Sequence, residues 1–510
     1  MKTVFVLFDS LNRRSLQPYG AKTIKTPNFN RLADRCVTFD THYVGSLPCM
    51  PARRDLQTGR LSFLHRSWGP LEPFDNSFPE LLGNGGVQSH LVSDHFHYWE
   101  DGGATYHNRY HTYEFIRGQE RDPWKAMVQA PWERLREKYH EMQFDTTPRS
   151  FHRNHIINRE FILEEKDFPS VQCFDAGINF LNYNRNAEDW FLQIETFDPH
   201  EPFFAPEGYR RDYPTDYEGP ILDWPRYARV TEAPEEYEEL CANYCAIVAL
   251  CDAQLGRLLN YFDEHELWKD TALLVSTDHG YLLGEHDWWA KVRMPVYDEL
   301  AKIPLFVYHP DFASNAGERR KSLTQTIDLM PTILDLHGLP SPPEVEGFSL
   351  INLLEDDGPL RKAALYGVWG SAANITDGRY TYFRYPDDFD KQEIFQYTLM
   401  PMHPMSLFAP EALRSAELVE PFNFTKGVPL LKISGHAETS INSGLGIPNR
   451  SLAKGFFQDQ GTVLFDTLND PGQIDPLEEK DLEDRLVCLM RDLMKANDAP
   501  PEVYRRFGMT

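Results

Sequence analysis

The chain has 510 residues, a formal net charge of −26 and 41% hydrophobic residues. The negative charge repels nucleic acid and anionic membranes, and no apolar run approaches the roughly 18 residues of a membrane span, so we expect no nucleic-acid or membrane partner. At about 150 residues per domain, the length allows two or three structural units.

The first apolar run, residues 4–8, ends at Asp9. It is too short for the apolar part of a signal peptide, so we interpret it as the first strand and expect a cytoplasmic protein. The seven cysteines are an odd number, which fits reduced thiols and no disulfide framework.

Further short apolar runs lie at residues 191–194, 273–275 and 305–308, and helical patterns lie between them at 28–35, 170–182 and 234–265. This alternation predicts an α/β fold with a large, mainly parallel central sheet sandwiched by helices. We expect it to form a catalytic domain over residues 1–355.

The pattern of apolar residues changes beyond residue 355, with short alternating segments at 365–369 and 379–384 and a helical pattern at 477–496. We expect a smaller C-terminal α+β subdomain over residues 356–510, with long loops in the Pro-, Gly- and Ser-rich segment 400–449.

Polar residues follow three of the apolar runs: Asp9 after the first, Asp198-Pro199-His200 after the second, and Asp278-His279-Gly280 after the third. In open α/β sheets, ligands collect at the carboxyl ends of the strands. These residues are therefore candidates for binding a metal or moving protons.

Cys49 begins the pattern Cys49-Met50-Pro51-Ala52-Arg53. The Pro restricts the backbone after the thiol, and Arg53, one helical turn on, returns a guanidinium to the same face. A nucleophile beside an Arg at a helix start suits an anionic ligand. The alternative is a buried Cys before a helix-starting Pro.

With Thr58-Gly59 after it, this pattern resembles the sulfatase family within the alkaline phosphatase superfamily. Other segments resemble the family in the same order, and the resemblance spans nearly the whole chain. They are Thr26-Pro27-Asn28, Pro199-His200-Glu201-Pro202, Thr277-Asp278-His279-Gly280, Lys291, Asp328-Leu329-Met330-Pro331-Thr332, and Leu464-Phe465-Asp466.

The resemblance implies that Cys49 is oxidised to formylglycine (3-oxoalanine) by a formylglycine-generating enzyme, and that the hydrated aldehyde attacks the ester. It also implies one divalent metal ion, Ca²⁺ or Mn²⁺ with Mg²⁺ as a further candidate. The ligands would be Asp9, Cys49, Asp278 and His279, although Asp-His pairs also occur as ordinary hydrogen-bonded structure.

The resemblance further assigns roles around the nucleophile. Arg53 would orient the aldehyde hydrate and the sulfate, and His200 and Lys291 are the candidate proton donors to the departing alcohol. Without the resemblance, His200 is a turn histidine between prolines and Lys291 is a surface lysine.

The chain departs from the family pattern at Ser10, where most sulfatases have a second Asp after the first strand. Ser10 is a doubtful metal ligand, and Asn12 or water is a possible substitute. Relatives that hydrolyse phosphonate monoesters and phosphodiesters also have a neutral residue here. The ester that is cleaved is therefore less certain than the type of reaction.

A second departure lies in residues 86–98, where the family has Gly-Lys followed by His and this chain has Ser93-Asp94. His97 is our candidate for deprotonating the hemiacetal, with His95 as the substitute. Together with His90, these histidines could instead form a structural patch.

Three hypotheses follow. The first is a metal-dependent sulfatase for aryl, alkyl or sugar sulfates, using Cys49 as formylglycine. The second is a phosphonate monoester hydrolase or phosphodiesterase using the same site, and the third is a catalytically silent binding protein. We expect a small anionic ester as the substrate and a homo-oligomer, either a dimer or a tetramer.

Overall fold

The computed structural model describes residues 1–148, 150–292, 295–387, 392–435 and 461–509. Its centre is an eight-stranded sheet, and strand β11 runs antiparallel to both its neighbours while the other pairs are parallel. The strands in spatial order are β12 (Arg319–Arg320), β2 (Val37–Phe39), β11 (Leu305–Tyr308), β8 (Thr271–Thr277), β1 (Lys2–Phe8), β7 (Trp190–Thr196), β5 (Gln88–Ser93) and β6 (Thr112–Phe115).

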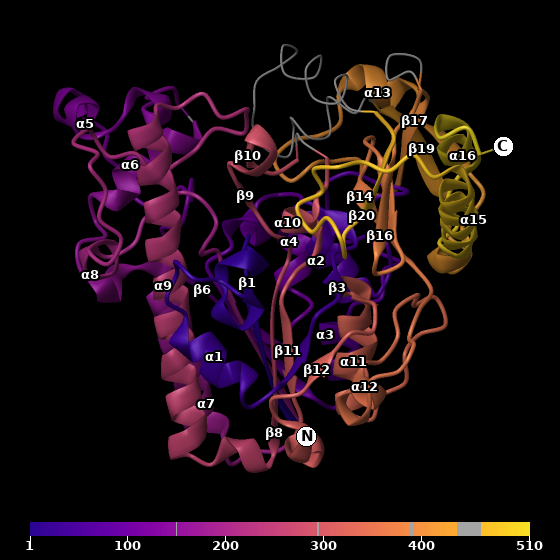
Figure 1. Ribbon diagram of the computed structural model, residues 1–510, viewed down its shortest axis with the longest axis horizontal. Helices are drawn as coiled ribbons and strands as arrows, with labels where there is room; N and C mark the ends of the chain where they lie inside the picture. The colour runs from indigo at the N-terminus through magenta and orange to yellow at the C-terminus, as the bar shows by residue number, and fades with distance from the viewer. Residues whose placement is uncertain (149, 293–294, 388–391, 436–460, 510) are drawn as a thin grey trace.

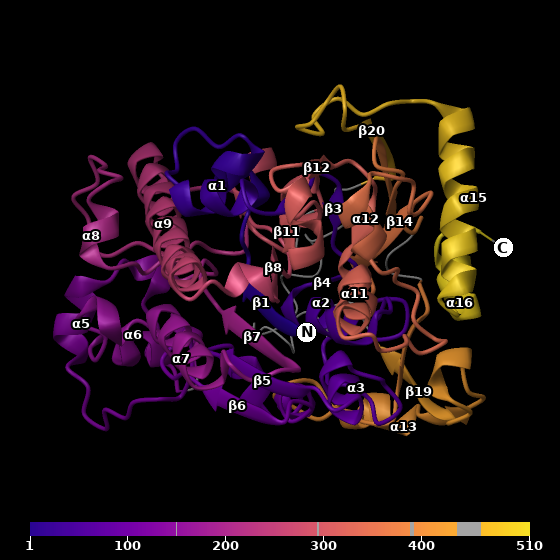
Figure 2. The same cartoon turned by 90° about the horizontal axis from the view of Figure 1, so that it is seen from below.

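Helices cover both faces of this sheet (Figure 2). One face carries α1 (Pro27–Ala33), α7 (Pro169–Asn184) and α9 (Pro234–Glu264), and the other carries α2 (Cys49–Thr58), α3 (Phe78–Asn84), α11 (Leu329–Leu336) and α12 (Ile351–Glu355). Strand β1 shows why: Val4, Val6 and Phe8 enter the first core, while Phe5 and Leu7 enter the second. A strand with apolar side chains on both faces must be covered on both.

Prolines set where the helices of the first face begin. Pro27, Pro169 and Pro234 each occupy the first turn of their helix, where the missing N–H costs nothing. Helix α2 ends at Gly59, whose φ of 67° is the left-handed conformation that favours glycine.

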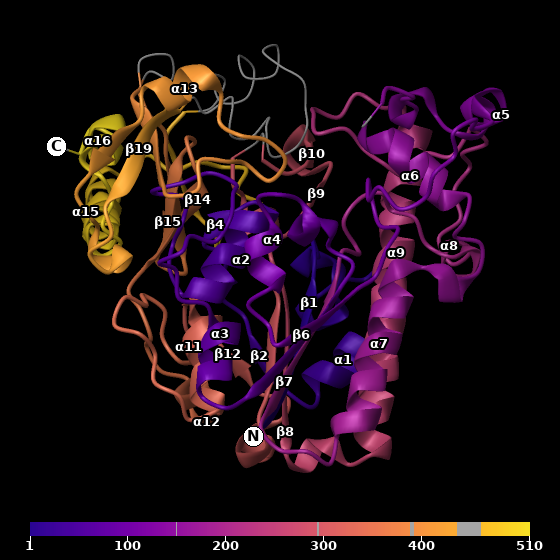
Figure 3. The same ribbon diagram turned by 180° about the vertical axis from the view of Figure 1, so that it is seen from behind.

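The C-terminal part forms a second sheet at the side of the molecule opposite α5 (Trp132–Lys138), α6 (Phe151–Arg159) and α8 (Glu207–Arg210) (Figure 3). Its strands in spatial order are β20 (Val463–Asp466), β16 (Tyr380–Arg384), β15 (Ala373–Thr376), β14 (Ala364–Val368) and β4 (Ser46–Leu47). Helix α15 (Lys480–Ala496) buries Leu486, Met490 and Met494 against it. Because β4 directly precedes Cys49, this sheet supports the nucleophile segment.

The expected long loops of residues 400–449 are partly wrong. Strands β18 (Glu417–Val419) and β19 (Leu430–Gly435) pair with β17 (Ile394–Thr398) in a three-stranded sheet, and α13 (Pro410–Arg414) lies beside it. The Pro content of the segment favoured a loop prediction over strands as short as these. The rest of the segment, 436–449, lies outside the described residues.

The remaining short elements are β3 (His42–Tyr43) with β13 (Thr324–Gln325), β9 (Leu282–Leu283) with β10 (Trp289–Ala290), and the helices α4 (Ala104–His107), α10 (Asp298–Ala301) and α16 (Pro501–Arg506). All seven cysteines are free thiols. None of the helices in the described ranges is long and apolar enough to cross a membrane.

Candidate active site

The polar residues that follow the central strands meet at one end of the sheet. Strand β1 pairs in parallel with β7 and β8 over its whole length, so Asp9 lies between the segments that follow those two strands. Asp278 and His279 come directly after β8, and His200 follows β7. All four side chains are buried.

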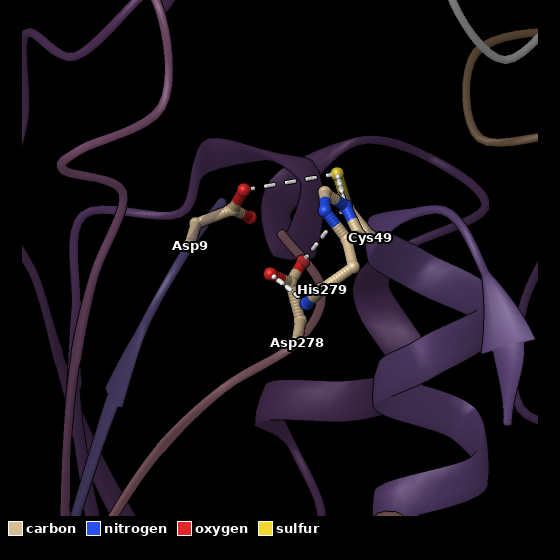
Figure 4. Close-up of side chains that lie close together, drawn as sticks. All are labelled: Asp9, Cys49, Asp278 and His279. Atoms are coloured by element: carbon tan, nitrogen blue, oxygen red, sulfur yellow. Dashed lines mark hydrogen bonds and ion pairs between the residues drawn. The ribbon is translucent and has the colours of Figure 1, made fainter. Parts of the chain in front are cut away.

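Cys49 is the first residue of α2, and its side chain points at the end of the sheet (Figure 4). Its Sγ lies 3.3 Å from His279 Nε2 and 3.9 Å from Asp9 Oδ1. Burial raises the pKa of the Cys49 thiol well above its usual value, and the Asp9 carboxylate adds to the rise.

Asp9, Cys49, Asp278 and His279 form a group that could hold a metal ion, because their ligand atoms lie within 4.8 Å of one another. His279 Nδ1 bonds to the carbonyl of Gly280 at 2.8 Å, which turns Nε2 toward the group. Two carboxylates, an imidazole and a residue at position 49 that offers sulfur or oxygen fit a divalent cation. The donor set therefore agrees with the predicted metal site.

Arg53 joins the members of this group. Its guanidinium donates to Asp9 Oδ2 at 2.9 Å and to Asp278 Oδ2 at 2.6 Å, and its Nη1 also donates to the Cys49 carbonyl at 3.1 Å. Nε donates to Glu195 Oε1 at 2.6 Å. Burial opposes the charge, but the three carboxylates outweigh it and raise the pKa of Arg53 well above its usual value.

Lys291 also contacts this group. Its Nζ lies 3.3 Å from Cys49 Sγ and 2.7 Å from Ser10 Oγ, and Ser10 in turn donates to Asp9 Oδ1 at 2.7 Å. Ser10 therefore joins Lys291 to Asp9 in a hydrogen-bonded chain. The neighbours of Lys291, Ala290 and Val292, have φ of 72° and 71°, a strained conformation for these residues.

A sequence model of the sulfatase family matches residues 2–339, which is well over half of the chain. The chain belongs to the sulfatase family. A second model, described as the C-terminal part of N-sulphoglucosamine sulphohydrolase, matches residues 284–414. The predicted family and the predicted enzyme class, a sulfuric ester hydrolase, are thereby confirmed.

Curated relatives share about a quarter of their residues with this sulfatase. An N-acetylglucosamine-6-O-sulfatase of Bacteroides thetaiotaomicron is 24% identical over 491 residues, covering 82% of this chain and 84% of the relative. An arylsulfatase of Clostridium perfringens is 23% identical over 384 residues, covering 69% of this chain and 78% of the relative.

Solved structures confirm the predicted fold. A protein in complex with its substrate D-glucosamine-2-N,6-O-disulfate superposes with a TM-score of 0.65 and 16% identity, covering 98% of this chain and 99% of the other. The phosphonate monoester hydrolase of Agrobacterium radiobacter gives a TM-score of 0.62 with 18% identity, covering 98% and 95%.

The histidines after β5 differ in their surroundings. His95 Nε2 lies 3.5 Å from Asp9 Oδ2, and neither ring nitrogen of His95 makes a hydrogen bond to a described residue. His97 is packed against the His95 ring, and its Nδ1 bonds to Glu100 at 2.8 Å. His95, the substitute in our prediction, is thus the one in contact with Asp9. The predicted role of His97 as the base stays a prediction.

His90, the third histidine of this segment, is remote from these two contacts, since it bonds to Thr112 and stacks on Phe180. Asp94, the residue predicted to replace the family's lysine, accepts from the backbone N–H of Phe197 at 2.7 Å. It therefore supports the segment that carries His200.

His200 itself is oriented by its neighbour, because Nδ1 bonds to the Glu201 carbonyl at 2.6 Å and leaves Nε2 for other contacts. Burial and the charge of Lys291 lower the pKa of His200. Asn12, suggested as an extra metal ligand, is engaged elsewhere: its amide donates to the Tyr281 carbonyl at 2.7 Å and its Oδ1 accepts from the N–H of Arg14 at 2.8 Å.

Glu195 was missed by the sequence reasoning, although it holds Arg53. Its second oxygen accepts from Tyr98 at 3.0 Å and from Gln193 at 2.8 Å. A signal was present: Gln193 and Glu195 are polar residues at alternate positions of an otherwise apolar strand, so they share one face of the sheet. Polar side chains in a buried strand need hydrogen-bond partners, and for Glu195 one of those partners is Arg53 of the site.

Proposed function

We propose that this sulfatase hydrolyses sulfate esters of aryl, alkyl or sugar alcohols, with Cys49 converted to formylglycine as the nucleophile. The observation that carries the proposal is the contact of Cys49 with His279 and Lys291 at the head of α2, with Arg53 bound to the Cys49 carbonyl below it. The N-acetylglucosamine-6-O-sulfatase and arylsulfatase relatives support sulfate as the anion.

Asp9, Asp278, His279 and residue 49 would hold one divalent metal ion. When bound, such an ion lowers the pKa of the hydrated aldehyde and neutralises one oxygen of the ester. Ca²⁺ and Mn²⁺ are the proposed ions, with Mg²⁺ as a further candidate, because hard carboxylates combine here with one imidazole.

The protein's own groups would position the reaction and move its protons. Arg53 fixes Asp9 and Asp278 and holds the first turn of α2, so residue 49 is presented in one orientation. Lys291 and His200, the latter through Nε2, are the proposed proton donors to the departing alcohol oxygen. His97, or His95 in contact with Asp9, would remove the proton that releases sulfate.

The charges of the site suit a singly charged ester. The carboxylates of Asp9, Asp278 and Glu195 are matched by Arg53 and Lys291 alone, so a divalent ion leaves a single positive charge for the substrate. A sulfate monoester carries one negative charge. Phosphonate monoesters and phosphodiesters carry the same charge, which keeps the second candidate function open.

The second candidate is therefore a phosphonate monoester hydrolase or phosphodiesterase using the same nucleophile. It is favoured by Ser10, which places a hydroxyl rather than a second carboxylate beside Asp9. The fold neighbour from Agrobacterium radiobacter is named a phosphonate monoester hydrolase.

The test begins with protein produced together with a formylglycine-generating enzyme. Mass spectrometry of the peptide around Cys49 is expected to show the mass loss of thiol-to-aldehyde conversion, and an active enzyme with an unmodified thiol would refute the mechanism. Turnover of an aryl sulfate, an aryl phosphonate and an aryl phosphodiester then ranks the functions, with sulfate expected first. Cys49→Ala is expected to abolish hydrolysis, and full activity in that variant would refute Cys49 as the nucleophile. No turnover of any of the three esters by the matured protein would support the silent binding protein.

A further inference from the structure

Two buried glutamates beside the site form no ion pair with a described Lys or Arg, although the charges of Arg121 and Lys291 act on them from nearby. Glu201 is 2% exposed and Glu120 is 5% exposed. Oε2 of each makes no hydrogen bond to the described residues, and neither carboxylate pairs with a Lys or Arg there. A buried carboxylate without a counter-charge costs several kcal/mol.

Glu201 directly follows His200 in the segment after β7. Its Oε1 accepts from the hydroxyl of Tyr227, while Oε2 lies 3.3 Å from His200 Nδ1 without a hydrogen bond, because that nitrogen bonds to the backbone carbonyl instead. The charge of Lys291 offsets only part of the effect of burial on Glu201, and its Nζ bonds to Ser10 Oγ and lies 3.7 Å from Asp9 Oδ1.

The two chain neighbours of Glu120 are fixed by side-chain hydrogen bonds. Gln119 Nε2 donates to Asp198 Oδ1 at 2.5 Å, and Arg121 Nη2 donates to Glu100 Oε1 at 2.8 Å. These contacts fix the segment against the loop that carries His200. Glu120 has a φ of 43°, a conformation that costs a non-glycine residue roughly 1–2 kcal/mol.

The electrostatics agree with this placement. Burial raises the pKa of Glu120 to about 8; the charge of Glu201 adds to the rise, and the charges of Arg121 and Lys291 offset only part of it. Burial also raises the pKa of Glu201. Each carboxyl therefore lies in a dry environment that a cation would stabilise.

We propose that Glu120 and Glu201 together bind a protonated amine on the alcohol part of the ester substrate. The inference rests on the proposed ester hydrolysis and adds the chemical class of the leaving group. In this proposal Glu120 and Glu201 recognise the leaving group, while Arg53 and Lys291 stabilise the anion.

An amine explains the pair better than a neutral hydroxyl does. An ammonium group brings up to three N–H donors and a positive charge, which can satisfy free oxygens on both carboxylates at once. A hydroxyl offers one donor and no positive charge to stabilise the ionised form of either carboxyl.

The experiment compares two aryl sulfates of nearly equal size, 4-(aminomethyl)phenyl sulfate and 4-(hydroxymethyl)phenyl sulfate. We expect the protein to prefer the amine by at least about tenfold in kcat/KM, and Glu120→Gln and Glu201→Gln each to reduce that ratio about tenfold. The ratio is taken within each variant, so a general loss of activity cancels. Equal turnover of both esters, or an unchanged ratio in both variants, would overturn the inference.

A binding measurement separates this inference from the proposed function. Calorimetry of the unsubstituted protein with benzylammonium and with benzyl alcohol needs neither hydrolysis nor a variant. Binding of benzylammonium alone supports the amine site even if no sulfate ester is cleaved, in which case only the proposed function fails. Sulfate hydrolysis without benzylammonium binding refutes the amine site and leaves the proposed function standing.

Discussion

The replacement Glu195→Gln tests whether the residue behind Arg53 sets the geometry of the site. The side chain keeps its size and loses one negative charge and one acceptor oxygen. In the native site Glu195 accepts from three donors: Arg53 Nε at 2.6 Å, Gln193 Nε2 at 2.8 Å and Tyr98 OH at 3.0 Å.

A glutamine has only one oxygen for these donors. If that oxygen stays with Arg53, the amide NH₂ faces Gln193 and Tyr98, and if it turns, the NH₂ faces the guanidinium. Each buried donor left without an acceptor costs about 1–3 kcal/mol. Arg53 keeps Asp9 and Asp278, so we expect a loss of about 3 kcal/mol in the free energy of unfolding, rather than a complete loss of the fold.

The effect on catalysis follows from what Arg53 touches. A residue that orients metal ligands typically changes activity or metal affinity by about 10–100-fold, and Arg53 contacts two carboxylates of the candidate metal group. We therefore expect kcat to fall within that range. Urea unfolding and steady-state kinetics of the metal-loaded protein measure the two effects.

The control is Glu188→Gln, which makes the same chemical change at an exposed position just before β7. It should stay within about 0.5 kcal/mol of the parent. The reasoning is refuted if Glu195→Gln matches this control in both stability and kcat, because Arg53 would then hold its place without Glu195.

Three further predictions address other parts of the chain. His95→Gln should lower kcat more than His97→Gln if contact with Asp9 marks the base, and steady-state kinetics showing the larger loss at His97 would instead support the family-based prediction. Glu266→Gly should stabilise the protein by about 1 kcal/mol, because Glu266 has a φ of 56°, whereas Glu264→Gly at the end of α9 should destabilise it by up to about 1 kcal/mol; opposite signs in urea unfolding are the check. Burial lowers the pKa of His65 from 6.5 to about 3, so the folded state favours the neutral ring and stability falls as the pH drops below 6.5. His65 alone should contribute about 1.4 kcal/mol per pH unit to the slope of unfolding free energy against pH between pH 4 and 6. The slope should be smaller by that amount in His65→Gln, and an unchanged slope would contradict the assignment.

Much of the fold could be predicted because its signals are local. Short apolar runs marked β1, β7, β8 and β11, and the helical patterns between them marked α1, α7 and α9. Strands β17, β18 and β19 were missed because they are short and pair with one another, and β18 and β19 lie within a Pro-rich stretch. Short pairings of this kind depend on neighbours that a local pattern does not contain.

The site residues also include some that the sequence could predict and some that it could not. Asp9, Cys49, Asp278 and His279 could be predicted because each lies in a motif at the end of a strand or the start of a helix, and parallel pairing brings those ends together. The residues that hold them could not, because their partners are distant in sequence. Glu195 is 142 positions from Arg53, which it binds.

Ser10 shows why a departure from a family pattern need not be a loss. From the sequence alone, Ser10 was interpreted as a doubtful metal ligand in place of a second Asp. In the structure its hydroxyl accepts from Lys291 and donates to Asp9, so it joins the ammonium group to the carboxylate. A second Asp in its place would bring another negative charge against Asp9 and would pair with Lys291 directly. With Ser10, Lys291 instead bonds to a neutral hydroxyl and lies 3.7 Å from Asp9 Oδ1.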